Sequence, residues 1–313
     1  MSKPSPLVYI IVLTWNGKKW LESLFPSLLK TNYPNFHILL VDNDSSDDTE
    51  RFIRKHPSVE YLKLPQNIGY AGGNNAGIRY VLKKEPKYIC LLNNDTKVMP
   101  NWLTELVTVT RSDSAIALTG PMVMDWTGKN ISKGTSFMNP YLEKDYKNKE
   151  LKSVYEVDSI EGCCMLIRTS VLKKIGLFDE TYFAYFEEMD LQRRIKAAGY
   201  KIIQATCSKI QHFEKGSQMR DDNNLKYLYA RNELYFILKN PNNPFGSNLL
   251  EFHKQIFMRM FWKMIKFKKP GIQILLKAYL WNLFHLLTTR LIRRKEIQAI
   301  IIEKTNEVIN FIL

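Results

Sequence analysis

Short apolar runs alternate with amphipathic segments along the first third of the chain. Four of the runs have the length of buried strands: Leu7–Leu13, Ile38–Val41, Val59–Leu64 and Tyr88–Leu92. After each run, apolar residues recur at helical spacing in segments that begin near Gly17, Asp47, Ala71 and Pro100. Strands that alternate with helices predict an α/β fold with a Rossmann-like, wound and mostly parallel sheet.

The pattern is less regular after residue 115. Apolar runs at Ala115–Met124 and Gly162–Ile167 predict two more strands, and another strand is expected at Lys201–Ala205. A helix is expected to begin near Glu187. Residues 125–156 are polar and predict a long irregular segment, which in a compact domain is often functional. We therefore expect a mixed second half.

The last part of the chain predicts helices again. A helical pattern begins near Asn223, and Pro241 and Pro244 mark a boundary beyond it. We expect one catalytic domain followed by an extension of basic amphipathic helices. The expected parts are a nucleotide-binding half at 1–114 and an acceptor-binding half at 115–240, which together form the domain 1–240, and the helical extension at 241–313.

Positive charge is concentrated near the C-terminus. The formal net charge is +14, and residues 251–313 hold 12 Lys and Arg against 4 Asp and Glu. Helices that mix these charges with Phe, Trp, Met and Leu suit the surface of an anionic membrane, and they equally suit a helical pair packed on the catalytic domain. Lys277 and His285 disfavour a transmembrane span at 272–291. No nucleic-acid-reading motif is present, so we expect no nucleic-acid partner.

The cysteines and the first residues indicate the cytoplasm. The cysteine spacing matches neither a zinc site nor a disulfide framework, so we expect four free thiols, at Cys90, Cys163, Cys164 and Cys207. Residues 1–6 lack the charged and apolar regions of a signal peptide. We expect a cytoplasmic protein, held at the inner face of the cell membrane if its tail binds lipid.

Acidic residues follow two of the predicted strands. Asp42 ends one strand, where its carboxylate would accept hydrogen bonds from a nucleobase or a ribose. Asp95 follows Asn93 and Asn94 after another strand and is a hard oxygen ligand for Mg²⁺ or Mn²⁺. The glycine-rich stretch at 67–77 would let the backbone approach a ligand closely. Each motif taken alone is about equally typical of a turn or a helix start.

Three acids lie within four residues where a helix is expected to begin. Glu187, Glu188 and Asp190 exceed the needs of helix capping, and Glu188 would accept the proton of an attacking hydroxyl. A structural interpretation is also open, because Asp190 and Arg194 have the spacing of an ion pair on one helix face. His212 lies beyond the last strand of this part and is either a structural residue or a ligand.

Taken in order, the motifs resemble the inverting nucleotide-sugar glycosyltransferases of family 2, which have the GT-A fold. The resemblance covers roughly residues 7–240, most of the expected domain. A helix with Arg231 and Asn232 is similar to one in the rhamnosyltransferase-like enzymes of surface polysaccharide assembly. The segments that carry the resemblance are Thr14-Trp-Asn16-Gly, Asp42-Asn43, Asn67-Ile-Gly69-Tyr-Ala-Gly72-Gly-Asn74, Asn93-Asn94-Asp95, Phe178-Asp179-Glu180 and Phe186-Glu187-Glu188-Met-Asp190.

The resemblance implies the catalytic and metal-binding residues. Asp95 would bind Mg²⁺ or Mn²⁺ with His212 as the second protein ligand. Glu188 would be the catalytic base, with Glu187 as the reserve candidate and Asp190 in the same acidic group. The family usually has Asp at the position of the base, so the Glu at 188 is a departure.

The resemblance also implies the residues that bind the nucleotide sugar. Thr14 and Asp42 would contact the nucleoside, and Arg231 would meet the pyrophosphate. The first Asp of the family's metal motif is replaced here by Asn93. Further contacts with the nucleotide sugar are expected from Asn16, Asn43, Gly69, Gly72, Asn74 and Asn94.

The implied activity is the metal-dependent transfer of a sugar from dTDP-rhamnose or a UDP-sugar to a hydroxyl of a glycan or lipid-linked acceptor. The anomeric configuration would invert, because a single displacement occurs. This reaction belongs to the synthesis of cell-surface polysaccharide. Two alternatives stay open. A sugar nucleotidyltransferase would need a basic, glycine-rich loop that the segment ending at Gly17 lacks, and a non-catalytic nucleotide-binding protein would leave the acids at 187–190 idle.

Overall fold

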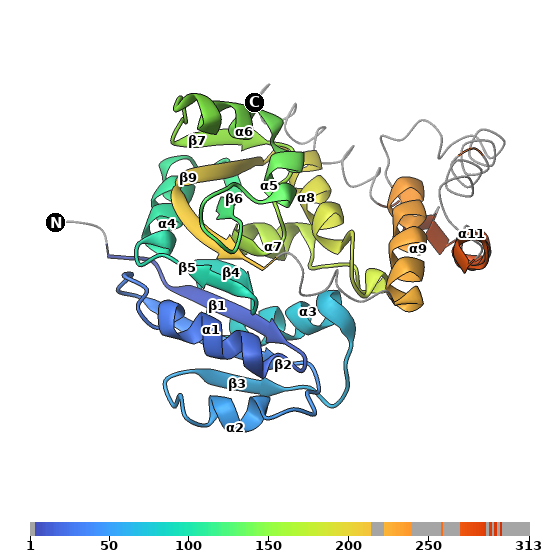
Figure 1. Cartoon of the computed structure of the whole chain (residues 1–313), viewed down its shortest axis with the longest axis horizontal. Coiled ribbons are helices and arrows are strands. Elements are labelled where there is room, and N and C mark those ends of the chain that lie inside the picture. The colour runs from blue at the N-terminus through green and yellow to red at the C-terminus, as the bar shows by residue number, and fades with distance from the viewer. Residues whose placement is uncertain are drawn as a thin grey trace, which may run out of the picture. The chain divides into compact units, whose positions relative to one another are not determined.

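The computed structural model describes residues 4–213, 222–239 and 270–285, together with residues 258, 288, 289, 291, 292 and 295. The strands of this part of the chain form a nine-stranded sheet in the order β3-β2-β1-β4-β8-β6-β9-β5, with β7 paired to β9 (Figure 1). The strands are β1 Val8–Thr14, β2 Phe36–Asp42, β3 Glu60–Lys63, β4 Tyr88–Asn93, β5 Thr96–Val98, β6 Ile116–Met124, β7 Val154–Val157, β8 Cys164–Arg168 and β9 Lys201–His212.

Helices lie between most of the strands. The 3-10 turn η1, Glu180–Tyr182, precedes α8. The helices are α1 Lys18–Leu28, α2 Thr49–Ile53, α3 Gly69–Leu82, α4 Trp102–Ser112, α5 Lys133–Met138, α6 Pro140–Asn148, α7 Thr169–Ile175, α8 Glu187–Ala197, α9 Asn223–Lys239 and α11 Pro270–Phe284.

The first four strands are parallel neighbours, which confirms the predicted α/β fold. β1 lies between β2 and β4, and β3 pairs with the outer side of β2. The register places Thr14 of β1 beside Asp42 of β2, and Leu13 of β1 beside Asn93 of β4. Because these strands are parallel, their carboxyl ends meet at one edge of the sheet, where ligands of such folds bind.

The second half of the sheet is mixed, as expected. β8 is antiparallel to both β4 and β6, while β6 and β9 are parallel. The short strand β5 was not predicted, and β9 continues to His212, well beyond Ala205 where the sequence pattern ends it. β5 and β9 pair antiparallel with Thr96 opposite His212.

The prediction of an irregular segment at residues 125–156 is wrong, because α5, α6 and most of β7 lie within it. Polar caps start both helices: the side chain of Ser132 accepts a hydrogen bond from the Thr135 N–H, and that of Asn139 accepts one from the Leu142 N–H. Leu142 is fully buried in a small cluster with Met122 of β6. One buried anchor is too few to produce a helical hydrophobic pattern.

Side chains of β1 alternate between two hydrophobic clusters on the two faces of the sheet. Val8, Ile10 and Val12 pack with residues of α1 and α4, whereas Tyr9 and Ile11 pack with residues of α3 and α8. Helices therefore cover both faces, as a largely parallel sheet requires.

The described residues fall into two compact units. The first contains residues 4–183 and 187–213, and the second contains 184–186, 222–239 and 270–285. Within the second unit α9 packs against α11, where the Tyr235 and Trp281 rings lie 5.9 Å apart. The boundary predicted at residues 240 and 241, and most of the extension beyond it, lie outside the described residues.

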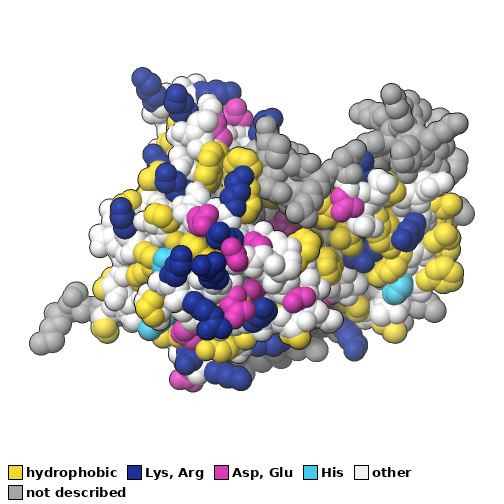
Figure 2. Space-filling model, turned by 60° about the horizontal axis from the view of Figure 1, so that its bottom comes forward, with side chains coloured by type: hydrophobic (Ala, Val, Ile, Leu, Met, Phe, Trp, Pro, Cys, Tyr) yellow, Lys and Arg dark blue, Asp and Glu magenta, His cyan; other side chains and the backbone are white. Residues whose placement is uncertain are grey.

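One side of α11 exposes hydrophobic residues. Leu276, Leu280, Leu283 and Phe284 are exposed, whereas Ala278 is buried. Figure 2 shows hydrophobic side chains at the surface of the part of the molecule that holds α9 and α11. Across the described part of the chain, none of the helices has both the length and the apolar character needed to cross a membrane.

Asn75 joins α3 to the segment before η1. Its Nδ2 donates to the Phe178 carbonyl (2.9 Å) and to Glu180 Oε1 (2.8 Å), and its Oδ1 accepts from the Phe178 N–H (3.0 Å). Asn75→Ala should lower the free energy of unfolding by about 2 kcal/mol, because buried backbone groups lose their partners. Urea unfolding would measure the change. The exposed control Asn148→Ala should change it by less than about 0.5 kcal/mol, and a similar loss in both variants would contradict the role of Asn75.

Candidate active site

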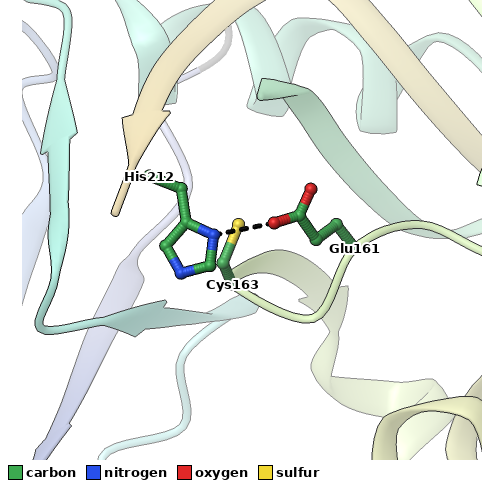
Figure 3. Close-up of side chains that lie close together, drawn as sticks. All are labelled: Glu161, Cys163 and His212. Atoms are coloured by element: carbon green, nitrogen blue, oxygen red, sulfur yellow. Dashed lines mark hydrogen bonds and ion pairs between the residues drawn. The ribbon is translucent and has the colours of Figure 1, made fainter. Parts of the chain in front are cut away.

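A partly buried histidine lies between two carboxylates at the end of β9. His212 Nε2 is 3.3 Å from Asp95 Oδ1, and His212 Nδ1 is 2.7 Å from Glu161 Oε1. Figure 3 shows the Glu161 contact beside the thiol of Cys163. The β5–β9 pairing creates the first contact, because it places Thr96 opposite His212 and so brings Asp95 next to the ring. The structure thus joins two residues that the sequence predicted to bind a metal.

Electrostatics around the ring favour its charged form. Burial alone would lower the pKa of His212, but Cys163, Asp95 and Glu161 together raise it well above its usual value. Burial would raise the pKa of Glu161, but hydrogen bonds from His212, Ser132 and Thr135 outweigh it and lower that pKa. Burial raises the pKa of the Cys163 thiol to about 12.

The donor atoms in this cluster fit a divalent metal ion. Asp95 Oδ1 and His212 Nε2 are close enough to bind one ion, and a carboxylate oxygen with an imidazole nitrogen suits Mn²⁺. Glu161 Oε, Cys163 Sγ and a His212 nitrogen also lie within 4.8 Å of one another, so two arrangements of ligands have to be distinguished.

Two glutamates form a carboxyl pair at the start of α8. Burial, and then the charge of Glu188, raise the pKa of Glu187 well above its usual value. Burial also raises the pKa of Glu188, but backbone N–H groups and the Glu187 carboxyl limit that rise. Glu187 therefore keeps a proton more readily than its neighbour. Among the described residues, one oxygen of each carboxyl group is buried without a hydrogen-bond partner.

Gly162 lies between the histidine cluster and the carboxyl pair. A Cβ at this position would lie 2.9 Å from Cγ of Glu188, so only glycine allows this close packing. Its carbonyl accepts a hydrogen bond from Tyr70 Oη (3.1 Å), which also donates to Asn93 Oδ1 (3.2 Å). The segment 161–163 thereby brings the two groups of acids to one site.

Asp190 has a different environment from its two neighbours. It is fully buried, and its two oxygens bind Arg193 (3.0 Å) and Arg194 (2.9 Å). This confirms the predicted Asp190–Arg194 ion pair. Arg194 also donates to the carbonyls of Ile175 and Leu177. Asp190 therefore anchors α8 within the first unit.

The residues predicted to contact the nucleoside lie at the carboxyl ends of the parallel strands. Asp42 is fully buried, and its carboxylate accepts hydrogen bonds from the Ser45 N–H (2.7 Å) and from Tyr61 Oη (2.7 Å). Thr14 Oγ1 accepts one from Asn94 Nδ2 (2.9 Å). Hydrogen bonds thus fix the orientation of these side chains at the edge where a ligand would bind.

Asn16 and Asn43 hold the loops around that edge. Asn16 adopts φ +49°, and its Oδ1 accepts hydrogen bonds from Ser46 and from the Asp47 N–H. Asn43 Nδ2 donates to Asn67 Oδ1 and to the carbonyl of Gly69. Both side chains shape the loops through these bonds, and their predicted contact with a nucleotide sugar stays a prediction.

The glycine-rich stretch forms the first turns of α3. Gly69 has φ +79°, and a Cβ there would lie 2.4 Å from the Phe183 carbonyl oxygen, so glycine is required. At Gly72 a Cβ would lie 3.0 Å from the Ile68 side chain. Asn74 Nδ2 donates to the Tyr70 carbonyl (3.0 Å). These contacts are structural, and contact with a ligand stays a prediction here also.

In the second unit, Arg231 Nε donates a hydrogen bond to Asn232 Oδ1 (2.8 Å), and each residue has a further partner. The Arg231 guanidinium lies 4.8 Å from the centre of the Trp281 ring, and its contact with a pyrophosphate stays a prediction. Asn232 Nδ2 donates to the carbonyls of Ala184 (2.7 Å) and Tyr185 (2.9 Å), directly before α8.

Sequence reasoning missed Glu161, Tyr61 and Asn232 as site residues. Glu161 directly precedes the apolar run Gly162–Ile167, and that position was the available signal. For Tyr61, no local pattern indicates the contact with Asp42, which is made across the β2–β3 pair. The position of Asn232 next to Arg231 was a signal. Its hydrogen bonds to residues 184 and 185 could not be predicted, because they join segments that are distant in the sequence.

Comparisons with known proteins show the family of this chain. Residues 9–176 match the family model described as Glycosyl transferase family 2. The low-salt glycan biosynthesis hexosyltransferase Agl10 of Haloferax volcanii is 27% identical over 230 residues, which cover 71% of this chain and 73% of that protein. The N-acetylglucosaminyl-diphospho-decaprenol L-rhamnosyltransferase of Mycobacterium tuberculosis is 24% identical over 238 residues, which cover 68% of this chain and 78% of that protein.

A solved structure shares the fold. GalNAc-T7 with UDP, GalNAc and Mn²⁺ matches with a TM-score of 0.57 and 17% identity, covering 81% of this chain and 55% of that one. This chain therefore spans about half of that structure, and the likeness concerns the fold alone.

The raised pKa of Glu187 predicts how stability depends on pH. Its folded pKa exceeds the ordinary value of 4.5, so the wild type loses stability as pH rises from that value through the folded pKa. Glu187→Gln carries no charge to bury. The free energy of unfolding of this variant should therefore equal that of the wild type near pH 4.5 and should exceed it increasingly towards pH 8. Urea unfolding at the two pH values would measure the difference.

The exposed residue Glu143 supplies a control. Its pKa is lowered by hydrogen bonds from Lys147 and Ser136, so Glu143→Gln should show a small effect of the opposite sign. A pH dependence of Glu187→Gln identical to that of the wild type would contradict the coupled carboxyl pair.

Proposed function

Because the chain belongs to glycosyl transferase family 2, we propose that it transfers a sugar from a nucleotide-diphosphate sugar to a hydroxyl of a glycan or lipid-linked acceptor. The fold is the GT-A fold, and a glycosyltransferase of glycan synthesis is the activity that the family and its relatives share. The proposal of a metal ion and a carboxylate base rests on one observation: an Asp-His pair and a carboxyl pair lie on either side of Gly162. Sugar transfer needs one group that stabilises the departing nucleoside diphosphate and another that accepts the proton of the attacking hydroxyl.

The Asp-His pair supports the role of a divalent metal. We assign Mg²⁺ or Mn²⁺ to Asp95 and His212, and GalNAc-T7 was crystallised with Mn²⁺. When bound, such an ion supplies positive charge that stabilises a departing nucleoside diphosphate. Asp95 and His212 would hold it near the end of β4, at the edge where Thr14 and Asp42 would contact the nucleoside.

The carboxyl pair supports the role of the base. Glu188 would accept the proton of the acceptor hydroxyl as the oxygen attacks the anomeric carbon and the nucleoside diphosphate leaves. One displacement inverts the configuration, which is typical of the family. Glu187, which keeps its proton more readily, leaves Glu188 as the carboxylate of the pair and stays the reserve candidate.

The donor and acceptor classes come from the relatives. A dTDP-rhamnose donor is supported by the name of the mycobacterial rhamnosyltransferase, and a UDP-sugar by the UDP in GalNAc-T7. The mycobacterial name also describes a lipid-linked acceptor, a decaprenol diphosphate. We propose an acceptor of this class, used in cell-surface polysaccharide synthesis.

A lipid-linked acceptor makes contact with a membrane surface useful. We propose that the exposed side of α11 binds anionic lipid at the inner face of the cell membrane, where the positive charge of residues 251–313 favours it. Leu276, Leu280, Leu283 and Phe284 lie on one side of a helix by their spacing, as an interfacial helix requires.

Removal of the proposed base should abolish transfer. Glu188→Gln should lower the rate about 100- to 10,000-fold, the usual contribution of a general base. Nucleotide-sugar binding, followed as a thermal shift with dTDP-rhamnose or UDP-sugars and Mn²⁺, should persist. Glu60→Gln, which alters a carboxyl bound to Tyr9 and Tyr80, serves as the control. Undiminished transfer by Glu188→Gln would remove this residue from the mechanism.

Substitution on α11 should weaken membrane binding. Leu280→Ser with Leu283→Ser in the full chain should reduce binding to anionic vesicles about tenfold or more, because each buried leucine contributes about 1.5 to 3 kcal/mol. Co-sedimentation with anionic and with neutral vesicles would measure it. Tyr141→Ser, which alters an exposed aromatic residue of α6, should have no effect. Equal sedimentation of all three proteins would argue against lipid binding by α11.

A further inference from the structure

Glu161 makes the shortest contact with the histidine of the proposed metal site. Its Oε1 lies 2.7 Å from His212 Nδ1 (Figure 3). Asp95 lies near the other ring nitrogen, Nε2. We infer that Glu161 is a positioning residue, which holds the His212 ring so that Nε2 faces the metal together with Asp95. This inference rests on the proposed function, in which Asp95 and His212 hold a divalent ion.

The contact selects one form of the ring. A carboxylate can only accept a hydrogen bond, so the hydrogen must lie on Nδ1 of His212. In a metal-bound ring Nε2 is then the nitrogen without hydrogen, and it is the nitrogen that faces Asp95 Oδ1. Carboxylates that accept from the distant nitrogen of a metal-bound histidine orient the ring and raise its basicity.

Glu161 is itself held in place. Its Oε2 accepts hydrogen bonds from Ser132 Oγ (2.6 Å) and Thr135 Oγ1 (3.1 Å) at the start of α5. A Cβ on Gly134 would lie 2.8 Å from Oε2 and Cδ of the glutamate, so the backbone of α5 closes over the side chain. A carboxylate fixed by two hydroxyls keeps its orientation while it holds the ring.

The hydrogen bonds of Glu161 join the start of α5 to the proposed metal site. α5 belongs to residues 125–156, which the sequence assigned to the acceptor side, and Glu161 connects its first turn to His212. The chain from Ser132 through Glu161 to His212 therefore couples the position of α5 to the orientation of a metal ligand.

A second arrangement of ligands makes a different prediction. If Glu161, Cys163 and His212 were the metal ligands, the ion would bind on the Nδ1 side, and Cys163 would be essential. The 2.7 Å distance between Nδ1 and Oε1 is that of a hydrogen bond, and both oxygens of Glu161 already have partners. The positioning role leaves Cys163 dispensable.

Binding of Mn²⁺ to the full chain, followed by electron paramagnetic resonance, tests the inference without measuring transfer. The titration uses Mn²⁺ alone and Mn²⁺ with UDP or dTDP. Glu161→Ala should weaken Mn²⁺ binding about 10- to 100-fold, the usual effect of losing such a partner. Glu161→Gln should lose less, because its amide oxygen still accepts from Nδ1. Cys163→Ala and Glu60→Gln should bind Mn²⁺ like the wild type.

Nitrogen NMR shifts of His212 in the chain saturated with diamagnetic Mg²⁺ give a second readout, which does not depend on affinity. The wild type should carry hydrogen on Nδ1, and Glu161→Ala should change that population, while the thermal midpoint controls for folding. Equal Mn²⁺ binding by the wild type and both Glu161 variants would overturn the positioning role alone. A loss in Cys163→Ala as large as in Glu161→Ala would overturn it in favour of the other ligand set. No Mn²⁺ binding by the wild type would overturn the metal role as well.

Discussion

The antiparallel pairing of β8 with β4 is the constraint on which the candidate active site depends. The Asn93 N–H at the end of β4 donates to the Cys163 carbonyl oxygen (2.9 Å), which fixes the segment before β8 at the edge of the sheet. From this position Glu161 reaches His212, and Gly162 packs against the carboxyl pair of α8. The pairing therefore fixes the turn at residues 162 and 163, and with it the position of Glu161 next to His212.

The site gathers several acids, and each buried carboxyl group is stabilised in a different way. Asp190 is neutralised by two arginines, Glu161 by the histidine and two hydroxyls, and Glu187 by keeping its proton. Unpaired burial of charge would be costly, so these partners allow the acids to lie close together. Glu188 shares the proton of its neighbour and keeps a buried oxygen without a partner among the described residues, as a group that receives a proton requires.

The features that the sequence predicted correctly depend on residues that lie close together in the chain. β1, β2 and β4 are buried on both faces and so appear as continuous apolar runs, and the Asp190–Arg194 pair follows from helical spacing alone. α5 and α6 begin at polar caps and have little apolar periodicity, so the segment containing them resembled a loop. Glu161 meets His212 across 51 positions of sequence, and only the pairing of strands brings them together.

Asn93 has a structural role beside the carboxyl pair. Its side chain accepts a hydrogen bond from Tyr70 Oη, and Tyr70 lies near the carboxyl groups of Glu187 and Glu188. A carboxylate at 93 would add a further negative charge beside a pair that already shares one proton, and would raise the pKa of the base. The neutral amide keeps the hydrogen bond without that repulsion. The metal site proposed above then relies on Asp95 and His212, so the orientation of the histidine would matter more than with a second aspartate.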